Sequence, residues 1–240
     1  GKHVFVEKPL AIARDQLVQV AEAHDAGEAR LMIGYNRRFA PLVGRMRDLL
    51  AGTDTPKSLI YTVNAGHVPE NHWVLDPEVG GGRIIGEVCH FADLACHLIG
   101  AELVSVEAVP IAGSAGDDGV SAVLQFADGS AAAIHYITHG HYGVPKERLE
   151  VHTSGRSLLL DDFRALTGHG WPGFSTEGGK TQDKGNAQCM HAFLRCITEG
   201  APAPIPFAEI ADGAEAVFRI DELARWTGEG VALPEEPVAS

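Results

Sequence analysis

The stretch HVFVEKPLAIARDQLVQVAEAHDAGEARLMIGYN, from His3 to Asn36, decides the fold. It opens on a short apolar strand over residues 3–6, rich in valine and phenylalanine, which are residues that favour strands. An amphipathic helix is predicted over 15–26, with Gly27 as its stop signal, and a second apolar strand over 31–35. Strand, helix and strand within about 35 residues are typical of one parallel βαβ unit. A further helix is predicted over 41–50.

From about Lys57 the sequence changes to short β-rich segments separated by turn signals. The candidate strands are SLIYTVNAG, LVSVEAVPI, SAVLQFADGS, AAAIHYITHG, RLEVHTSG and SLLLDDF. Asp128-Gly129 is a good hairpin turn between two of them. Because most of these strands follow one another without a helix between them, we expect a mostly antiparallel sheet.

Three helices are predicted to interrupt or follow that sheet, over 84–99, 187–199 and 208–227. The segment Gly168–Gly185 is rich in glycine, threonine and serine and is expected to be a long surface loop. The chain after Gly228 is expected to be a peripheral extension. The sequence therefore predicts one piece of a parallel α/β domain, followed by an α+β domain with an open sheet flanked by helices.

Composition excludes several classes of function. The 240 residues carry a formal net charge of −13, which argues against sequence-independent nucleic-acid binding because that requires a basic surface. No apolar run reaches the ~18 residues of a membrane helix, so no membrane partner is expected. Four cysteines do not form a disulfide framework in a chain of this size. We expect a cytoplasmic location.

Glu7-Lys8-Pro9 stands at the C-terminal end of a predicted parallel strand, where ligands of open α/β sheets collect. Lys8 could donate a proton or a hydrogen bond to a reacting oxygen, and Pro9 fixes the strand exit, with a cis bond as one possibility. On the residues alone, a solvated lysine is the favoured reading. Asn36 and Arg37 leave the next strand on the same edge, where they could bind a carboxamide, a phosphate or a sugar hydroxyl, or could lie in solvent.

The stretch GGGRIIGEVCHFADLACHLIG, from Gly80 to Gly100, has apolar residues at helical spacing and predicts a buried helix. His90 shares a face with Glu87 and with Asp93, so a carboxylate could orient it as an acid or base. A core histidine hydrogen-bonded by Asp93 is the alternative. Trp73 could stack on a sugar or nicotinamide ring, or pack under the glycine turn. No metal is predicted, because one helix cannot surround a zinc ion and no CxxC or HExxH is present.

These motifs together resemble a known family. EKP after an apolar strand, then GYNRRFAP, then the Gly80–Gly100 stretch, in that order and spacing, resemble the Gfo/Idh/MocA oxidoreductases, which are NAD(P)-dependent dehydrogenases of sugars, sugar acids and inositols. The later KERLEVHTSGRSLLLDDF and QDKGNAQCMHAFLRCITEGAPAPIPF also look like that family. They most resemble a branch in which this module is fused behind a zinc-type alcohol-dehydrogenase-like half.

The resemblance implies a fold and an assembly. Residues 1–54 would be the C-terminal part of a dinucleotide-binding Rossmann domain. Residues 55–240 would form the C-terminal substrate and oligomerisation domain, with the helix over 208–227 packing back on the first domain. A homo-oligomer through the large sheet is implied, and the cofactor is NAD or NADP.

The resemblance also implies roles for individual residues. Lys8, His90 and Glu87 would be catalytic. The residues implied at the cofactor are Glu7, Lys8, Pro9, Asn36 and Arg37, and those implied at the substrate are Trp73, Arg83 and Asp93.

Two departures from the family pattern qualify this picture. Gly86 stands where the family has an aspartate four residues before the histidine, which leaves Glu87 as a possible substitute. No glycine-rich GxGxxG turn precedes EKP, so the chain is expected to be the C-terminal portion of a longer enzyme. The function expected for that parent is oxidation or reduction of a sugar, sugar-acid or inositol hydroxyl. The alternatives are an NAD-assisted glycosidase or sugar lyase, and a non-catalytic binding or assembly domain.

Overall fold

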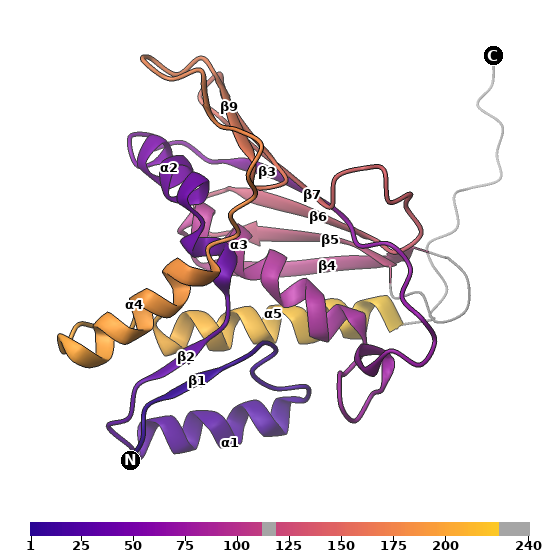
Figure 1. Cartoon of the computed structure of the whole chain (residues 1–240). Coiled ribbons are helices and arrows are strands. Elements are labelled where there is room, and N and C mark those ends of the chain that lie inside the picture. The colour runs from indigo at the N-terminus through magenta and orange to yellow at the C-terminus, as the bar shows by residue number, and fades with distance from the viewer. Residues whose placement is uncertain (112–118, 226–240) are drawn as a thin grey trace, which may run out of the picture.

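The small sheet near the N-terminus is the predicted βαβ unit. The computed structural model describes residues 1–111 and 119–225. Strands β1 (Val4–Val6) and β2 (Leu31–Ile33) pair in parallel, and α1 (Arg14–Asp25) connects them at the bottom of Figure 1. The prediction for this region is confirmed, because the apolar strands and the amphipathic helix lie where the sequence indicates.

The large sheet contains eight strands in the order β10-β9-β8-β7-β3-β6-β5-β4. Their bounds are β3 (Ser58–Asn64), β4 (Leu103–Ile111), β5 (Gly119–Phe126), β6 (Ala131–Ile137), β7 (Glu147–Thr153), β8 (Arg156–Asp161), β9 (Ala165–His169) and β10 (Thr176–Gly178). All neighbouring pairs are antiparallel except β3 and β6, which run parallel because β3 inserts between β6 and β7. The predicted mostly antiparallel sheet is confirmed.

The prediction of a long surface loop over Gly168–Gly185 is wrong in part. The whole of β10 lies in this segment and pairs antiparallel with β9, Thr176 opposite Thr167, and the last two residues of β9 also lie in the segment. A Cβ on Gly168 would lie 2.5 Å from Cδ1 of Phe174, so only glycine lets that ring pack on the strand. The glycine-rich composition therefore serves packing here, and it hides the strand pattern.

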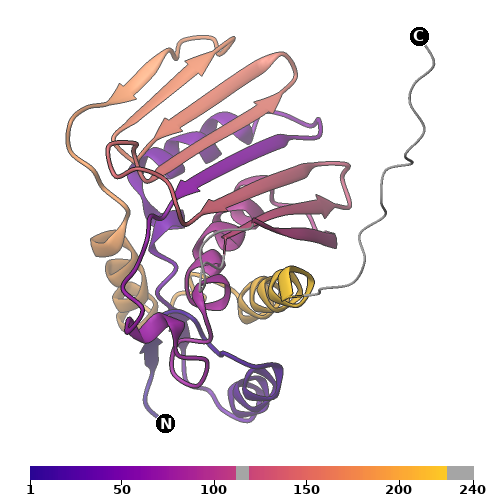
Figure 2. The ribbon, with the colours of Figure 1, turned by 90° about the vertical axis from the view of Figure 1, so that its right-hand side faces the viewer.

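The helices lie mainly on one face of the large sheet (Figures 1 and 2). They are η1 (Asn36–Phe39), α2 (Pro41–Leu50), η2 (Trp73–Leu75), η3 (Ile84–Val88), α3 (Cys89–Ile99), α4 (Asn186–Thr198) and α5 (Phe207–Arg225). The predicted helix over 84–99 begins with a π-helical turn, η3, and continues as α3. The predicted helix over 208–227 ends beyond the described residues, as does the predicted extension after Gly228.

The core lies between α3, α5 and the inner face of the large sheet. Alternating residues of β3 are buried there, namely Leu59, Tyr61 and Val63, and the Tyr61 ring meets the Phe91 ring of α3 edge to face. On its other side α5 reaches α1, where Arg14 forms ion pairs with Glu215 and Glu222.

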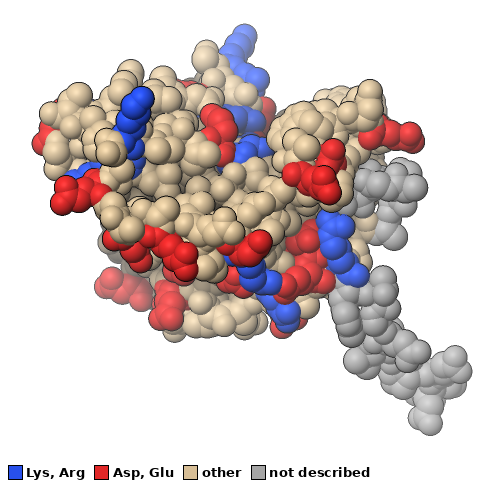
Figure 3. All heavy atoms as spheres, turned by 90° about the horizontal axis from the view of Figure 1, so that it is seen from below, with Lys and Arg blue, Asp and Glu red and all other residues tan. Residues whose placement is uncertain are grey.

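The face of the molecule that carries α1 is mixed in charge. In Figure 3, lysine and arginine side chains are scattered among acidic ones and form no continuous basic patch on this face. Within the described parts of the chain, none of the helices has the length and apolar character needed to cross a membrane.

Candidate functional site

The candidate site lies where the exit of β1 meets the junction of η3 and α3. Lys8 follows β1, and its ammonium Nζ donates a hydrogen bond to the carbonyl oxygen of Gly86 at 2.6 Å. The Lys8–Pro9 peptide bond is cis, which the sequence left open. Gly86 lies four residues before His90. The chain therefore brings Lys8 to the start of the helix that carries the histidine.

His90, in the first turn of α3, has an unpartnered ring nitrogen and a lowered pKa. Its Nδ1 atom is buried and has no hydrogen-bond partner among the described residues, while the residue as a whole is partly exposed. Burial, together with the positive charges of Arg37 and Lys8, lowers the pKa of His90 well below its ordinary value of 6.5. The imidazole is therefore neutral at pH 7 and able to accept a proton.

The glycine at position 86 does not leave an empty space where the family has an aspartate side chain. A Cβ at this position would lie 2.8 Å from Cγ2 of Val74 and 3.1 Å from the carbonyl oxygen of Gly80. The space that an aspartate would need is thus filled by the segment around η2. The unpartnered Nδ1 of His90 is consistent with the absence of a carboxylate at this position.

Glu87 lies beside this histidine and is ionised. The hydroxyl of Tyr136 donates a hydrogen bond to its Oε2, and Arg83 forms an ion pair with it at 3.3 Å. Burial alone would raise the pKa of Glu87, but the Tyr136 hydrogen bond and the charge of Lys146 outweigh it, so the pKa is lowered. The carboxylate therefore keeps its charge at neutral pH.

Arg83, which the resemblance implied at the substrate, is only 1% exposed. Its NH1 donates to the carbonyl of Gly66 at 2.8 Å, and its guanidinium lies over the Tyr136 ring, 5.3 Å from the centroid. The side chain therefore supports Glu87 and Tyr136 from below the surface.

The expected contact between His90 and Asp93 is wrong. Asp93 is 2% exposed and pairs with Arg38, whose Nε donates to Oδ2 at 3.1 Å and whose NH2 donates to Oδ1. Helical spacing alone allowed His90 and Asp93 to meet, but η1 brings a stronger partner against the carboxylate. With 2% of its surface exposed and both oxygens bound by Arg38, Asp93 has little surface left for a substrate.

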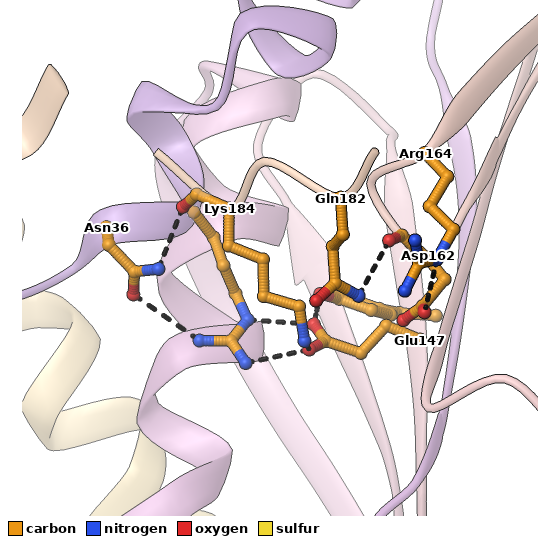
Figure 4. Close-up of polar contacts among 8 residues, drawn as sticks. Asn36, Glu147, Asp162, Arg164, Gln182 and Lys184 are labelled. Atoms are coloured by element: carbon orange, nitrogen blue, oxygen red, sulfur yellow. Dashed lines mark hydrogen bonds and ion pairs between the residues drawn. The ribbon is translucent and has the colours of Figure 1, made fainter. Parts of the chain in front are cut away.

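Asn36 and Arg37 both bind other residues of the protein, and Figure 4 shows Asn36 against Lys184. Arg37 donates to both carboxylate oxygens of Glu147 at 2.8 Å, and Lys184 donates to Oε1 of the same carboxylate at 2.7 Å. Asn36 Nδ2 donates to the carbonyl of Lys184 at 2.8 Å. Because both side chains are buried and paired, we regard them as supports of the site rather than as cofactor ligands.

Glu147 is the centre of that network. Burial would raise its pKa, but the hydrogen bonds and charges of Arg37 and Lys184 lower it to about 2. Tyr61 adds a further hydrogen bond from its hydroxyl. The network ties η1, β3, β7 and the segment before α4 into one support.

The remaining implied residues lie at the rim. Trp73 is 51% exposed, and its backbone packs at the glycine turn, where a Cβ on Gly80 would lie 2.7 Å from the Trp73 carbonyl oxygen. Glu7 lies against the exit of β2, because a Cβ on Gly34 would lie 2.8 Å from Oε2 of Glu7.

Sequence reasoning missed Tyr136, Lys146, Glu147 and Lys184. They come from β6, from the start of β7 and from the segment before α4, and only the tertiary fold brings them to Glu87, Arg37 and the surroundings of His90. One signal was available in the sequence. Glu147 shares the inward face of its strand with Leu149 and Val151, and a carboxylate at an inward strand position requires a partner.

Comparison with known proteins places the chain in a family. Residues 56–159 match the family model "GFO/IDH/MocA C-terminal domain". The chain is 30% identical over 247 residues to inositol 2-dehydrogenase of Rhizobium meliloti (strain 1021), covering 95% of this chain and 72% of that protein. It is 29% identical over 175 residues to myo-inositol 2-dehydrogenase of Thermotoga maritima, covering 69% of this chain and 51% of that protein. The chain belongs to the Gfo/Idh/MocA family.

Solved structures agree on the fold. An NAD binding oxidoreductase from Klebsiella pneumoniae superposes with a TM-score of 0.80 at 19% identity, covering 92% of this chain and 71% of that one. Aldose-aldose oxidoreductase from Caulobacter crescentus superposes with a TM-score of 0.77 at 20% identity, covering 93% and 70%. At these identities the likeness establishes the shared fold.

Proposed function

We propose that this chain carries the catalytic centre of an NAD(P)-dependent oxidoreductase that acts on a hydroxyl of a sugar, a sugar acid or an inositol. The observation that carries the proposal is the convergence of Lys8 and the His90 helix, through the 2.6 Å hydrogen bond from Lys8 to Gly86, at the exit of a parallel strand. The names of the relatives support the substrate class. Besides the two inositol dehydrogenases, 1,5-anhydro-D-fructose reductase of Ensifer adhaerens is 33% identical over 147 residues.

The residues present fit one part of a dinucleotide site. In this proposal residues 1–54 are the C-terminal part of the dinucleotide-binding domain, and Glu7, Lys8 and Pro9 would line the nicotinamide end of the cofactor. The tight approach of Glu7 to Gly34 supports a closely packed edge where β1 and β2 end. The unpartnered Nδ1 of His90 supports a polar ligand nearby. A bound nicotinamide would supply the hydride acceptor or donor.

The side chains of this chain would manage the proton and the substrate oxygen. Neutral His90 would accept the hydroxyl proton during oxidation and return it during reduction. Lys8, oriented by the Gly86 carbonyl, would donate a hydrogen bond to the oxygen as negative charge develops on it. Ionised Glu87 would help to hold the positive groups around the site in place.

The test is reduction of NAD or NADP by the protein at its full natural length, against a panel of hexoses, hexuronates and inositols. We expect reduced cofactor to form with at least one of them, and Lys8→Met and His90→Gln to slow its formation by about 10²-fold or more. Absence of reduced cofactor with every compound, or full activity in both variants, would overturn the proposal. Cleavage of a glycoside without net formation of reduced cofactor would instead favour the glycosidase or lyase alternative.

A further inference from the structure

We infer that the substrate of this site carries an anionic group, a carboxylate or a phosphate on a polyhydroxylated ring or chain, and that Lys146 binds that group. The inference rests on the proposed function, because it names the substrate class of the same site. It depends on the position of Lys146, on the charge balance around His90 and on the solvation of the Lys146 ammonium.

Lys146 is held in place by its backbone. It immediately precedes β7, and its carbonyl oxygen accepts a hydrogen bond from the backbone nitrogen of Asn64 at 2.7 Å, which fixes it to the end of β3. Its side chain is half-buried. Across residues 1–111 and 119–225, its ammonium has neither a hydrogen-bond partner nor an ion-pair partner. The positive charge of Lys146 nevertheless acts on both Glu87 and His90, so it belongs to their surroundings.

The charges around His90 do not cancel. Arg37 and Lys184 share the single carboxylate of Glu147, with ion pairs at 2.8 and 2.7 Å. Glu87 is already paired with Arg83 at 3.3 Å.

Two cations are therefore left without a carboxylate. Lys8 donates to a neutral carbonyl, and Lys146 has no partner in the described parts of the chain. This local excess of positive charge stands out in a chain whose formal net charge is −13. A local excess of charge of one sign attracts a ligand of the opposite sign.

Solvation of the Lys146 ammonium favours the same ligand. Its partial burial penalises the charged form, and this burial is the first cause of its lowered pKa. A neutral polyol offers hydroxyl groups that replace only part of the lost hydration. A carboxylate or phosphate forms a charge-assisted hydrogen bond and restores the charge balance. Lys146 would thus distinguish acidic sugars from neutral ones.

The experiment compares matched substrates in the protein at its full natural length. Each set contains a hexose, its uronic acid and its 6-phosphate, in the gluco, galacto and manno configurations, with myo-inositol as a further neutral compound. We measure kcat/KM from reduced cofactor and substrate binding by calorimetry. The variants are Lys146→Met, the charge-retaining Lys146→Arg and the control Lys2→Met, which removes an exposed lysine near the N-terminus.

We expect an anionic member of one set to exceed its neutral counterpart about ten- to hundredfold in kcat/KM, and this preference to weaken as salt is raised. Lys146→Met should remove the preference mainly through KM, Lys146→Arg should keep most of it, and Lys2→Met should leave it unchanged. Whether the uronate or the phosphate is preferred identifies the anion. A melting curve verifies that each variant is folded.

The failures are distinguishable. Equal turnover of neutral and anionic sugars, with no effect of Lys146→Met, would overturn the inference and leave the proposed function standing. A change confined to the KM of the cofactor would assign Lys146 to the cofactor and would also overturn it. Binding of the acidic sugar that depends on Lys146, with no reduction of NAD or NADP, would support the inference and overturn the proposed function.

Discussion

Two groups of side chains in the candidate site differ in how completely they are paired: a paired cluster around Glu147, and an incompletely paired cluster of Lys8 and His90. Glu147, 1% exposed, accepts hydrogen bonds from Arg37, Lys184 and Tyr61. His90 has a buried Nδ1 without a partner in the described residues. Complete pairing fixes geometry, and incomplete pairing is costly unless a ligand removes the cost. The contrast separates a fully paired network from the side chains that we propose react.

The largest effect is expected from the incompletely paired cluster. Replacing His90 by Gln removes the proposed base, and replacing Lys8 by Met removes the group that we propose donates to the substrate oxygen. Each change should lower kcat by about 10²- to 10⁴-fold, the usual range for a general acid or base. Steady-state kinetics with the substrate found for the wild type measure this loss. Unchanged melting temperatures would show that the loss is chemical, whereas a loss of less than about threefold would remove these residues from the mechanism.

The paired cluster should respond in stability instead. Glu147→Gln leaves Arg37 and Lys184 without their shared carboxylate, and we expect the free energy of unfolding to fall by about 3 kcal/mol at pH 7. The pKa of Glu147 in the folded protein, about 2, lies below its ordinary value of 4.5. Its stabilising contribution is therefore complete above pH 4.5 and is lost as the pH falls towards 2.

Urea unfolding as a function of pH tests this directly. The difference between wild type and Glu147→Gln should shrink between pH 4.5 and 2. The matched control is Glu150→Gln on the same strand, because Glu150 is 22% exposed and pairs with Arg148 at 2.8 Å. The control should change stability by less than about 1 kcal/mol. Equal effects of the two substitutions would mean that the buried network does not support the site.

A smaller effect on stability is expected from a change in the packing around Gly86. Gly86→Asp places a Cβ 2.8 Å from Cγ2 of Val74, so the added carboxylate should destabilise the protein by about 1–3 kcal/mol rather than simply complete the family motif. Combining it with Val74→Ala should recover part of that loss. Thermal unfolding of the two single variants and the double variant measures the coupling. A stable Gly86→Asp variant with wild-type Val74 would contradict this reading of the turn.

The smallest effect should come from the surface contact between α1 and α5. Arg14 pairs with Glu215 and Glu222, and the exposed fractions of these side chains lie between 42% and 55%. Arg14→Ala should therefore cost less than about 1 kcal/mol in the free energy of unfolding, and less still at high salt. A loss as large as that of Glu147→Gln would mean that this exposed pair holds α5 in place, and that exposure is a poor guide in this protein.

Local patterns predicted much of the fold. The helix over 41–50 begins and ends where the sequence indicated, because Pro41 starts it and its apolar residues keep helical spacing. The pairing of β3 with β6 and β7 was out of reach, since these strands are separated by more than sixty residues and their order depends on the whole sheet. The pairing of β9 with β10 was missed because the segment is rich in glycine, of which Gly168 makes room for the Phe174 ring.

In the candidate site, too, local motifs were predictable and long-range contacts were not. Lys8, Glu87 and His90 could be proposed from the sequence because each belongs to a short motif beside a strand exit or on one helix. The residues that they actually contact could not be predicted. Asp93 pairs with Arg38 rather than His90, and Glu87 pairs with Tyr136, which lies 49 residues away. Spacing along a helix reports which residues can meet, while tertiary packing decides which do.

The protonation state of His90 tests the account most directly. Nitrogen-15 NMR of histidine-labelled protein, with the His90 signal assigned by its absence in His90→Gln, reports the pKa of this ring. The account predicts a neutral imidazole at pH 7 and a pKa below the ordinary 6.5, because the ring is buried among positive charges. A His90 that titrates at or above 6.5 would contradict it, because the ring would then be neither unpaired nor surrounded by excess positive charge.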